Sequence, residues 1–287
     1  MALIEMKSIT KDYHLGETVV SALRGVDLQI DNKEFLAIWG PSGSGKTTLL
    51  NLIYAIDEPT TGNLTITGKD FRSLTYTQKN EYRIKTIGFI SQGFSLVPVL
   101  SALGNVMLPL LRNEVSAAEA QKQAMRCLEE FGLSDIIYNR PAKMTVGQQQ
   151  MVSIARALVN NPSLVIADEP TANLDSQAAR MIIDLMCELN ERHQTTFIFS
   201  THDQRLLDRV KRLVRLEDGK IVHRGTKQDY SNSWRMFGSF KRVNKASWQN
   251  KRKSIPEQYM FSKEDTQKII KLIAEANGVI LATPKVR

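Results

Sequence analysis

Residues 40–48, with the sequence GPSGSGKTT, decide how this chain folds. They follow the apolar run Phe35–Trp39 and lead into a second apolar run, Leu49–Ile53. A buried strand, a glycine-rich turn and the start of a helix are the context in which a phosphate-binding P-loop is found. The glycines let successive backbone amides turn toward one point, at which the positive end of the new helix is also directed. The stretch therefore predicts a site for the phosphates of a nucleotide.

Two side chains of this loop carry chemistry of their own. Lys46 would reach the β- and γ-phosphates as a point charge, and the Thr47 hydroxyl would be a ligand of Mg²⁺. The loop residues expected at the nucleotide are Gly40, Ser42, Gly43, Ser44, Gly45, Lys46, Thr47 and Thr48. The alternative, a glycine-rich turn without chemistry, is disfavoured by the strand before it and the helix after it.

Four short apolar runs are each followed by a polar group that could act at a site. The runs are Phe35–Trp39, Ile87–Ser91, Leu164–Ala167 and Phe197–Ser200. The groups that follow them are the P-loop, Gln92, the pair Asp168-Glu169, and Thr201-His202. Continuous apolar strands separated by helical segments predict a buried parallel sheet, and ligands bind beyond the carboxyl ends of such strands. We therefore expect these groups to share one site.

The predicted fold class is α/β, with a P-loop (RecA-like) parallel sheet at its core. Alternating residues in Ile4–Ile30 and Leu64–Ile66 predict an additional antiparallel β layer. Residues 93–161 predict a helical subdomain, with helices at Ser116–Phe131 and Gly147–Val159.

The pair Asp168-Glu169 follows Lys46 by 122 residues and ends an apolar strand, as in a Walker B motif. Asp168 would hold Mg²⁺ through its water shell, and Glu169 could polarise the attacking water. Adjacent acidic residues usually mark a solvated turn. The preceding strand, in a chain that also has a P-loop, favours the catalytic interpretation.

The sequence resembles that of ABC-transporter ATPases over about residues 2–225. The segment DEPTANLD (residues 168–175) and the segment STHD (residues 200–203) look like the Walker B, D-loop and H-loop of that family. Gln92 matches the Q-loop, and Tyr13 is an aromatic candidate for the A-loop. Within the family, four segments resemble the lipoprotein-releasing and macrolide-exporting group that also contains FtsE. These segments are Lys11–Tyr13, Ala22–Leu28, Asp57–Gly62 and Phe94–Pro98.

The resemblance implies ATP and Mg²⁺ as cofactors and a role for each matching residue. Gln92 would sense Mg²⁺ and the attacking water, and His202 would contact the γ-phosphate. Asp175 would cross a dimer interface, and Tyr13 would stack on adenine. Thr47, Gln92 and Asp168 are the implied metal ligands. Without the other family motifs in their usual order, a glutamine or histidine at a strand end would usually be a cap, and Tyr13 could simply pack in the β layer.

The signature motif departs from the family pattern Leu-Ser-Gly-Gly-Gln, because the chain reads MTVGQQQM at residues 144–151. Thr145, Gly147 and Gln148 keep groups that would touch the nucleotide bound to a second subunit. Val146 places a branched side chain where the family has none, and the φ values open to glycine are lost there. Met144 and Met151 replace the usual leucine and arginine. The motifs acting in cis are intact, and we expect the altered signature to slow turnover in a homodimer.

The charge of the chain is unevenly distributed. The net charge is +8, and residues 225–287 contain 13 Lys/Arg against 5 Asp/Glu, which accounts for all of it. We therefore divide the chain into an ATPase domain, residues 1–224, and a basic C-terminal extension, residues 225–287, with a helix after the capping box Ser262–Asp265. The extension could be a solvated basic face, or it could contact anionic lipid or an acidic partner. Nucleic acid is disfavoured as a partner, since no nucleic-acid-binding module is visible.

Other features concern the compartment. Cys127 and Cys187 lie far apart without metal spacing, which favours a reducing cytosol and packing in the core. The N-terminal residues lack the pattern of a secretory signal, and the apolar stretch Phe94–Leu111 is interrupted by Pro98 and Pro109.

The resemblance implies an ATP-hydrolysing subunit, cytoplasmic and peripheral on the inner face of the inner membrane. Its partners would be a separate integral-membrane permease and a second ATPase subunit, either a copy or a paralogue. Two alternatives stay open: an FtsE-like regulatory ATPase that signals without transport, and a slow nucleotide-gated module. A soluble DNA-repair or translation ATPase is disfavoured by the single nucleotide domain and the absence of a coiled-coil insertion.

Overall fold

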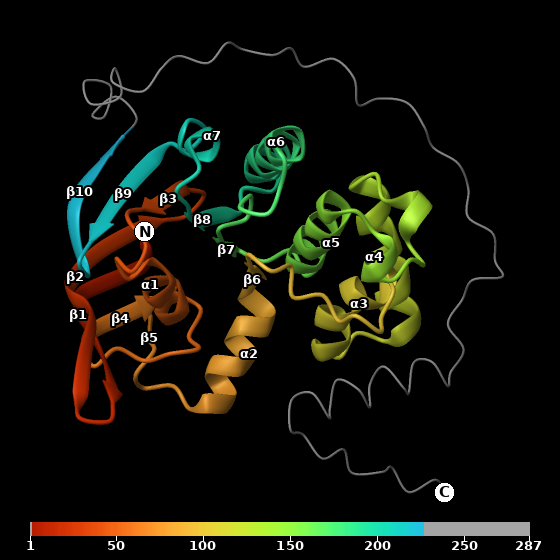
Figure 1. Ribbon diagram of the computed structural model, residues 1–287. Coiled ribbons are helices and arrows are strands. Elements are labelled where there is room, and N and C mark those ends of the chain that lie inside the picture. Colours follow the sequence, from red (N-terminus) through yellow and green to blue (C-terminus); the bar gives the residue numbers. More distant parts are fainter. Residues whose placement is uncertain (1, 227–287) are drawn as a thin grey trace, which may run out of the picture. The chain divides into compact units, whose positions relative to one another are not determined.

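The computed structural model describes residues 2–226, and they form two β-sheets with helices between and beside them (Figure 1). The larger sheet has six strands in the order β10-β9-β3-β8-β7-β6. Their bounds are β3 Phe35–Trp39, β6 Ile87–Ile90, β7 Leu164–Asp168, β8 Thr196–Ser200, β9 Arg212–Glu217 and β10 Lys220–Thr226. Neighbouring strands from β9 to β6 are parallel, and β10 pairs antiparallel with β9. The predicted buried parallel sheet is confirmed.

The smaller sheet is the predicted antiparallel layer. Its four strands have the order β2-β1-β4-β5, with bounds β1 Ala2–Leu15, β2 Thr18–Asp31, β4 Thr61–Ile66 and β5 Lys69–Asp70. The helix that starts at the P-loop, α1 Lys46–Ile53, packs in a core shared by both sheets. Leu49 and Ile53 of α1 are buried there with Ile4 of β1 and Leu36 of β3. This packing fixes the P-loop against two layers at once.

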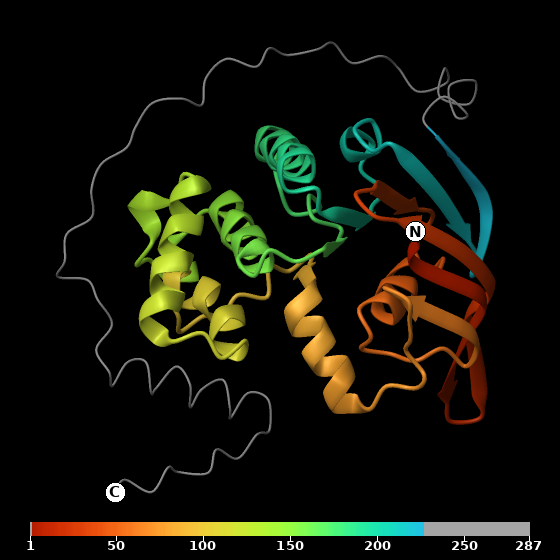
Figure 2. The ribbon, with the colours of Figure 1, turned by 180° about the vertical axis from the view of Figure 1, so that it is seen from behind.

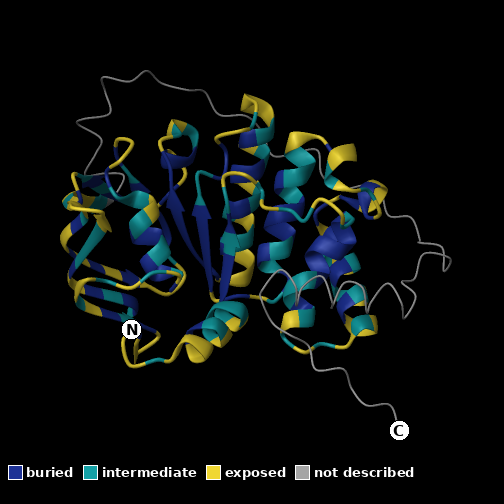
Figure 3. Cartoon of the chain, turned by 60° about the horizontal axis from the view of Figure 1, so that its bottom comes forward, coloured by how far each residue is buried: buried dark blue, intermediate teal, exposed yellow. Residues whose placement is uncertain are grey.

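The central strands are buried because helices cover the faces of the large sheet (Figure 3). On the face opposite α1, three aromatic rings pack against one another: Phe35 of β3 contacts Phe197 and Phe199 of β8, and its edge-to-face contact with Phe199 has a centroid distance of 4.7 Å. Helix α6, Ser176–His193, and the short α7, Gln204–Leu207, complete this part of the fold. Strands of this kind read as continuous apolar runs because both faces are covered.

The predicted helical subdomain is present as α3 Ala102–Arg112, α4 Ala117–Glu130 and α5 Val146–Leu158. Figure 2 shows these helices grouped on the side of the parallel sheet away from the antiparallel layer. Ser116 caps α4 and Thr145 caps α5, so both predicted helices begin within a residue or two of their expected starts. Helix α3 was not predicted, because Pro109, which usually ends a helix, lies inside it. A further helix, α2 Tyr76–Thr86, precedes β6.

Three sequence predictions remain partly or wholly outside the structure. The extension from residue 227 onward, including the helix expected after Ser262–Asp265, lies outside the described residues. Strand β10 continues to Thr226, two residues past the expected boundary, and the division of the chain into domains stays a prediction. Among residues 2–226, no helix is long and apolar enough to cross a membrane.

The two cysteines have free thiols and are half-buried, so they are less enclosed than expected of core residues. Burial raises the pKa of Cys127 to about 12 and that of Cys187 to about 11. Both thiols are therefore protonated and unreactive at neutral pH.

Candidate nucleotide site

The P-loop connects the end of β3 to the start of α1, and its glycines are required by their neighbours. Gly40 and Gly45 have φ values of 155° and 102°. A Cβ at Gly40 would lie 2.0 Å from the carbonyl oxygen of Leu216, and one at Gly45 would lie 2.5 Å from that of Ala22. The loop is thus pressed between β9 and β2, and only glycine fits at these two positions.

Lys46 is the first residue of α1, and its side chain folds back over the loop. Its Nζ donates hydrogen bonds to the carbonyl oxygens of Gly40 (2.9 Å) and Pro41 (3.0 Å). The Ser44 hydroxyl is buried in the same loop without a hydrogen-bond partner. A cation and an uncommitted hydroxyl on a loop of inward-turning amides fit a polyphosphate.

Asp168, at the end of β7, lies between α1 and β8. Its Oδ2 accepts a hydrogen bond from the Thr47 hydroxyl at 3.3 Å, and its Oδ1 accepts one from the Ser200 hydroxyl. Hydroxyl and carboxylate oxygens are the ligands that Mg²⁺ prefers, so Thr47 and Asp168 fit a magnesium site. Two predicted metal ligands that are 121 residues apart in sequence are therefore neighbours.

Glu169 follows in a strained turn that presents its carboxylate to the site. The residue has a φ of 47°, and its amide donates to the Ser200 carbonyl at 3.0 Å. Its Oε1 is 2.8 Å from Nδ1 of His202, while its Oε2 is buried and has no hydrogen-bond partner. The Glu169 side chain is 14% exposed and that of His202 is 74% exposed. A buried carboxylate oxygen with nothing bound to it is suited to accept a hydrogen bond from water.

A depression of about 250 Å³ opens beside this pair, lined also by Thr171, Asp203 and Arg205. Asp203 accepts a hydrogen bond of 2.7 Å from the Thr171 hydroxyl and two-pronged hydrogen bonds from the Arg205 guanidinium. Burial raises the pKa of Asp203, but the hydrogen bonds from Arg205 and Thr171 outweigh it and hold that pKa below its ordinary value. Sequence reasoning did not single out Thr171 or Arg205, although Asp203 lies in the segment compared with the H-loop.

Gln92 follows β6 and is exposed. Its backbone is held by the loop between β7 and α6. The Gln92 carbonyl accepts a hydrogen bond of 2.8 Å from the Asn173 side chain. Just beyond it, Phe94 and Ser95 have φ values of 60° and 50°, in the left-handed region. Their carbonyl oxygens accept hydrogen bonds of 2.9 and 2.6 Å from the guanidinium of Arg156, on α5. Neither Asn173 nor Arg156 was singled out from the sequence: Asn173 lies in the segment compared with the Walker B motif and D-loop, and Arg156 has no signal apart from its neighbours in space.

Tyr13, on β1, lies beside α1. Its hydroxyl donates a 2.7 Å hydrogen bond to Oδ2 of Asp57 and is also within hydrogen-bonding reach of Thr48. Nζ of Lys11 lies 4.9 Å from the centroid of the Tyr13 ring. The aromatic residue expected near adenine is thus held near the P-loop helix by two other side chains.

The signature residues lie at the start of α5. Thr145 and Gln148 form a capping box: the Gln148 amide donates to the Thr145 hydroxyl at 3.2 Å, and the Thr145 amide donates to Oε1 of Gln148 at 2.9 Å. Gly147 faces the start of α6, since a Cβ there would lie 3.6 Å from Cβ of Ala178. Asp175 caps α6 by accepting from the amides of Gln177 and Ala178, and these hydrogen bonds lower its pKa. The structure therefore places the signature residues beside the start of the Asp175 helix.

One part of the expectation for Val146 is wrong. Val146 is the first helical residue of α5 and does not have the positive φ that only glycine adopts easily. The backbone is therefore not strained by valine, and what remains is the bulk of a side chain that is 45% exposed at the helix start.

Residues 23–172 match the ABC transporter family. The chain belongs to the ABC transporter family. It is 40% identical over 222 residues to the lipoprotein-releasing system ATP-binding protein LolD of Legionella pneumophila, covering 77% of this chain and 98% of that protein. It is 44% identical over 223 residues to the macrolide export ATP-binding/permease protein MacB of Syntrophobacter fumaroxidans. That match covers 77% of this chain, which spans only 31% of the MacB length.

A solved structure agrees with the fold. The dimeric ATP-binding cassette MJ0796 of Methanocaldococcus jannaschii, in a post-hydrolysis state bound to ADP and Pi, superposes with a TM-score of 0.73 at 39% identity. The match covers 78% of this chain and 98% of the cassette. The predicted α/β ATPase fold and the predicted activity are confirmed: the chain is an ATP-binding ABC ATPase.

Proposed function

We propose that this ABC ATPase forms a dimer on binding ATP and drives a separate integral-membrane permease from the cytoplasmic face of the inner membrane. The near full-length similarity to LolD, an ATP-binding protein of a lipoprotein-releasing system, supports a chain that works with a permease on another polypeptide. The dimeric cassette with ADP and Pi supports the pairing of two ATPase chains, either copies or paralogues. Lipoproteins and macrolides, named for the relatives, favour a hydrophobic or peptidic substrate that is exported or extracted.

The observation that carries the catalytic part is the buried, unpartnered Oε2 of Glu169 next to His202. In this proposal Glu169 accepts the proton of the attacking water, and His202 contacts the γ-phosphate. Lys46 and the loop amides bind the β- and γ-phosphates. Mg²⁺, held by Thr47 and Asp168 with Gln92 as a further ligand, would supply positive charge to the phosphate oxygens. Thr145, Gly147 and Gln148 contribute to the site of the second chain.

A second candidate is a nucleotide-gated module with slow turnover. It is favoured by the exposed Val146 side chain at the start of α5, where a partner's nucleotide would have to approach closely. An FtsE-like ATPase that signals across the membrane shares every feature of the site, so the membrane partner distinguishes it. Contact of the basic extension with anionic lipid stays a prediction about residues outside the described part.

The experiment that tests the proposal is co-purification of the tagged full-length chain from its own membranes, with and without ATP and vanadate. Recovery of one integral-membrane protein that raises the ATPase rate severalfold is the expected result. A chain that is recovered alone, and is not stimulated by membranes, would overturn the proposal. A partner without a substrate pathway would favour the signalling alternative.

A further inference from the structure

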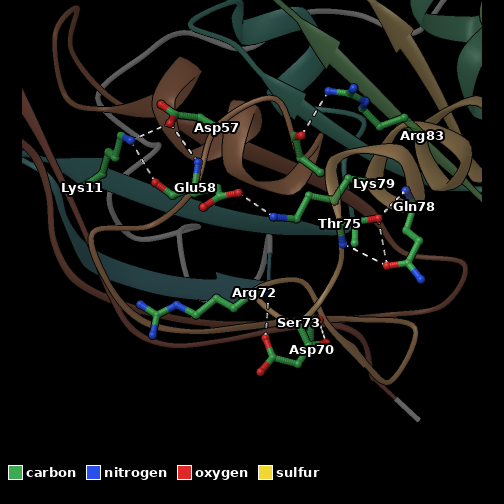
Figure 4. A network of polar contacts seen from close by, with 11 residues as sticks. Lys11, Asp57, Glu58, Asp70, Arg72, Ser73, Thr75, Gln78, Lys79 and Arg83 are labelled. Atoms are coloured by element: carbon green, nitrogen blue, oxygen red, sulfur yellow. Dashed lines mark hydrogen bonds and ion pairs between the residues drawn. The ribbon is translucent and has the colours of Figure 1, made fainter.

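The surroundings of Tyr13 form a cluster that the nucleotide motifs do not include. The Tyr13 cluster consists of Lys11 and Tyr13 on β1, and Asp57 from the segment after α1. Asp57 accepts a hydrogen bond from each of the other two residues. Its Oδ2 accepts one from the Tyr13 hydroxyl at 2.7 Å, and its Oδ1 accepts one from Nζ of Lys11 at 2.5 Å. Figure 4 shows Lys11 reaching across to Asp57 and to the neighbouring Glu58, whose carbonyl oxygen it binds at 2.9 Å.

The cluster is partly withdrawn from water. The Lys11 side chain is 13% exposed and that of Asp57 is 24% exposed. An ion pair at this depth is more rigid than an exposed pair, and the Asp57 carboxylate also accepts hydrogen bonds from the Tyr13 hydroxyl and, at 2.8 Å, from the Glu58 amide. The Lys11 ammonium therefore keeps its place over one face of the Tyr13 ring, 4.9 Å from the centroid.

These contacts restrict the orientation of the Tyr13 ring and determine which of its faces a base could stack on. A tyrosine side chain has two rotatable angles, and anchoring the hydroxyl restricts both of them. Lys11 lies over one face of the ring, so a planar group that stacks on Tyr13 would do so on the opposite face. The hydroxyl also lies within reach of Thr48, so the ring is held close to the loop that binds phosphate.

Asp57 is itself fixed by the P-loop helix. The chain turns back after α1, with Ala55 at a φ of 55° and the Ile56 amide bonded to the Asn51 carbonyl at 3.1 Å. Asp57 is thereby tied to the same helix whose first residues hold the phosphates. A displacement of α1 would move the phosphate loop and the Tyr13 cluster together.

The protonation states agree with this geometry. Burial, and then the hydrogen bond to Asp57, raise the pKa of Tyr13, which keeps the hydroxyl a donor. Burial acts to raise the pKa of Asp57, but the hydrogen bonds from Lys11 and Tyr13 lower it below its ordinary value, which keeps the carboxylate an acceptor.

We propose that Asp57 and Lys11 are positioning residues for the nucleobase, which hold the Tyr13 ring with one face open to receive it. The proposal rests on the proposed function, in which Tyr13 stacks on adenine. Neither residue touches ATP: Asp57 acts through the Tyr13 hydroxyl, and Lys11 through the ring face and the Asp57 carboxylate. Their removal therefore affects binding of the base and leaves binding of the phosphates unchanged.

The test compares ATP with inorganic tripolyphosphate, which has the phosphates and no base. Both are measured as competitors of a labelled nucleotide on the full-length chain. We expect Asp57→Ala to weaken ATP binding about 3- to 10-fold, as for the net loss of one ordinary hydrogen bond, because the contacts that are removed orient the ring and do not reach ATP. Tripolyphosphate affinity and kcat at saturating ATP should stay within about twofold of the parent, because the phosphate loop is untouched.

The matched control is Glu58→Ala, which removes the adjacent carboxylate. Glu58 pairs with Lys79, its side chain is 70% exposed, and its carbonyl contact to Lys11 survives the substitution. ATP affinity should not change, because the Tyr13 ring keeps its contacts with Asp57 and Lys11 in this variant. Equal loss in both variants, or equal loss for ATP and tripolyphosphate, would overturn the proposal in favour of a structural role.

A double-mutant cycle tests whether Asp57 acts on ATP binding through the Tyr13 hydroxyl. If Asp57 acts through the hydroxyl, Asp57→Ala in a Tyr13→Phe background should weaken ATP binding clearly less than in the parent. Tyr13→Ala distinguishes failure of the Asp57 positioning role from failure of base stacking on Tyr13. If it weakens ATP but Asp57→Ala does not, the positioning role is wrong and the base platform stands. If Tyr13→Ala leaves the ratio of ATP to tripolyphosphate affinity unchanged, the base does not stack there and both fail.

Discussion

The nucleotide site at the sheet edge and the signature residues at the start of α5 are built by different kinds of contact. At the sheet edge, side chains meet from loops after different strands, such as Thr47 with Asp168 and Glu169 with His202. At the start of α5, Thr145 and Gln148, three residues apart in sequence, form reciprocal hydrogen bonds with each other. The first arrangement exists only in the folded chain, and the second forms wherever that helix begins.

The two regions also differ in what they leave unpaired. The sheet edge contains buried groups without partners, Oε2 of Glu169 and the Ser44 hydroxyl, which a nucleotide and its water can satisfy. The polar groups of the capping box already have partners, and the exposed Val146 side chain lies between them. The cis site is therefore preorganised for ligand, whereas the contribution of α5 to a second chain depends on a few surface side chains.

The substitution with the largest expected effect is Glu169→Gln, which removes the base and keeps the shape of the sheet edge. Hydrolysis should fall about 10²- to 10⁴-fold, as for loss of a positioned general base. ATP binding should survive, and the dimer should accumulate on ATP. Phosphate release and size-exclusion chromatography measure the two effects. Turnover at the parent rate would remove Glu169 from the mechanism.

Lys46→Ala should have the next largest effect, on binding at the same edge. The ammonium that now binds the Gly40 and Pro41 carbonyls would no longer reach the β- and γ-phosphates. ATP affinity should fall at least about tenfold, and turnover should be lost with it. Equilibrium binding measures the first effect, with Lys220→Ala on β10 as a control outside the loop. Unchanged affinity would contradict the P-loop assignment.

Arg156→Met tests the connection between the two regions, because α5 carries both the signature and the arginine that holds Phe94 and Ser95. Two carbonyl oxygens in strained backbone would lose their donors, so the free energy of unfolding should fall by about 1–3 kcal/mol. Urea denaturation measures it, with Arg126→Met on the exposed side of α4 as the control. These two hydrogen bonds from Arg156 to the Phe94 and Ser95 carbonyls form what we call the Arg156 clamp. Equal stability of the two variants would show that the Arg156 clamp contributes nothing to the free energy of unfolding.

Restoring the signature should have a smaller effect. The combination Val146→Gly, Met144→Leu and Met151→Arg reduces bulk at the start of α5, and in a homodimer it should accelerate hydrolysis severalfold. Met144 is buried, but leucine has a similar volume, so the cost in stability should stay below about 1.5 kcal/mol. An unchanged rate, with a dimer that still forms on ATP, would mean that the parent residues are tolerated.

The smallest effect is expected from ending the chain at Thr226, the last residue of β10. Every nucleotide-binding motif lies upstream, so ATP affinity should stay within about twofold of the parent value. If the basic extension attracts anionic membranes, the truncated chain should lose vesicle binding most clearly at low salt, where charges are least screened. A folded, truncated chain that no longer binds ATP would show that the domain boundary is misplaced.

The sequence predicted those elements whose signals are local. The apolar runs at Phe35–Trp39 and Leu164–Ala167 became β3 and β7, and Ser116 marked the start of α4. Helix α3 was missed because Pro109, a residue that usually ends a helix, lies inside it. The positive φ at Phe94 and Ser95 has no sequence signal at all, since the hydrogen bonds that hold it come from Arg156, about sixty residues later.

By itself, the sequence determined the parallel sheet, the phosphate loop and the order of the motifs, because strand period, glycine spacing and helix caps depend on residues a few positions apart. Only the tertiary structure decided which polar groups meet. The pairing of Asp57 with Tyr13, the Arg156 clamp and the free oxygen of Glu169 all arise from segments distant in sequence. Such contacts depend on how whole elements pack, and packing is a property of the entire core rather than of any one stretch.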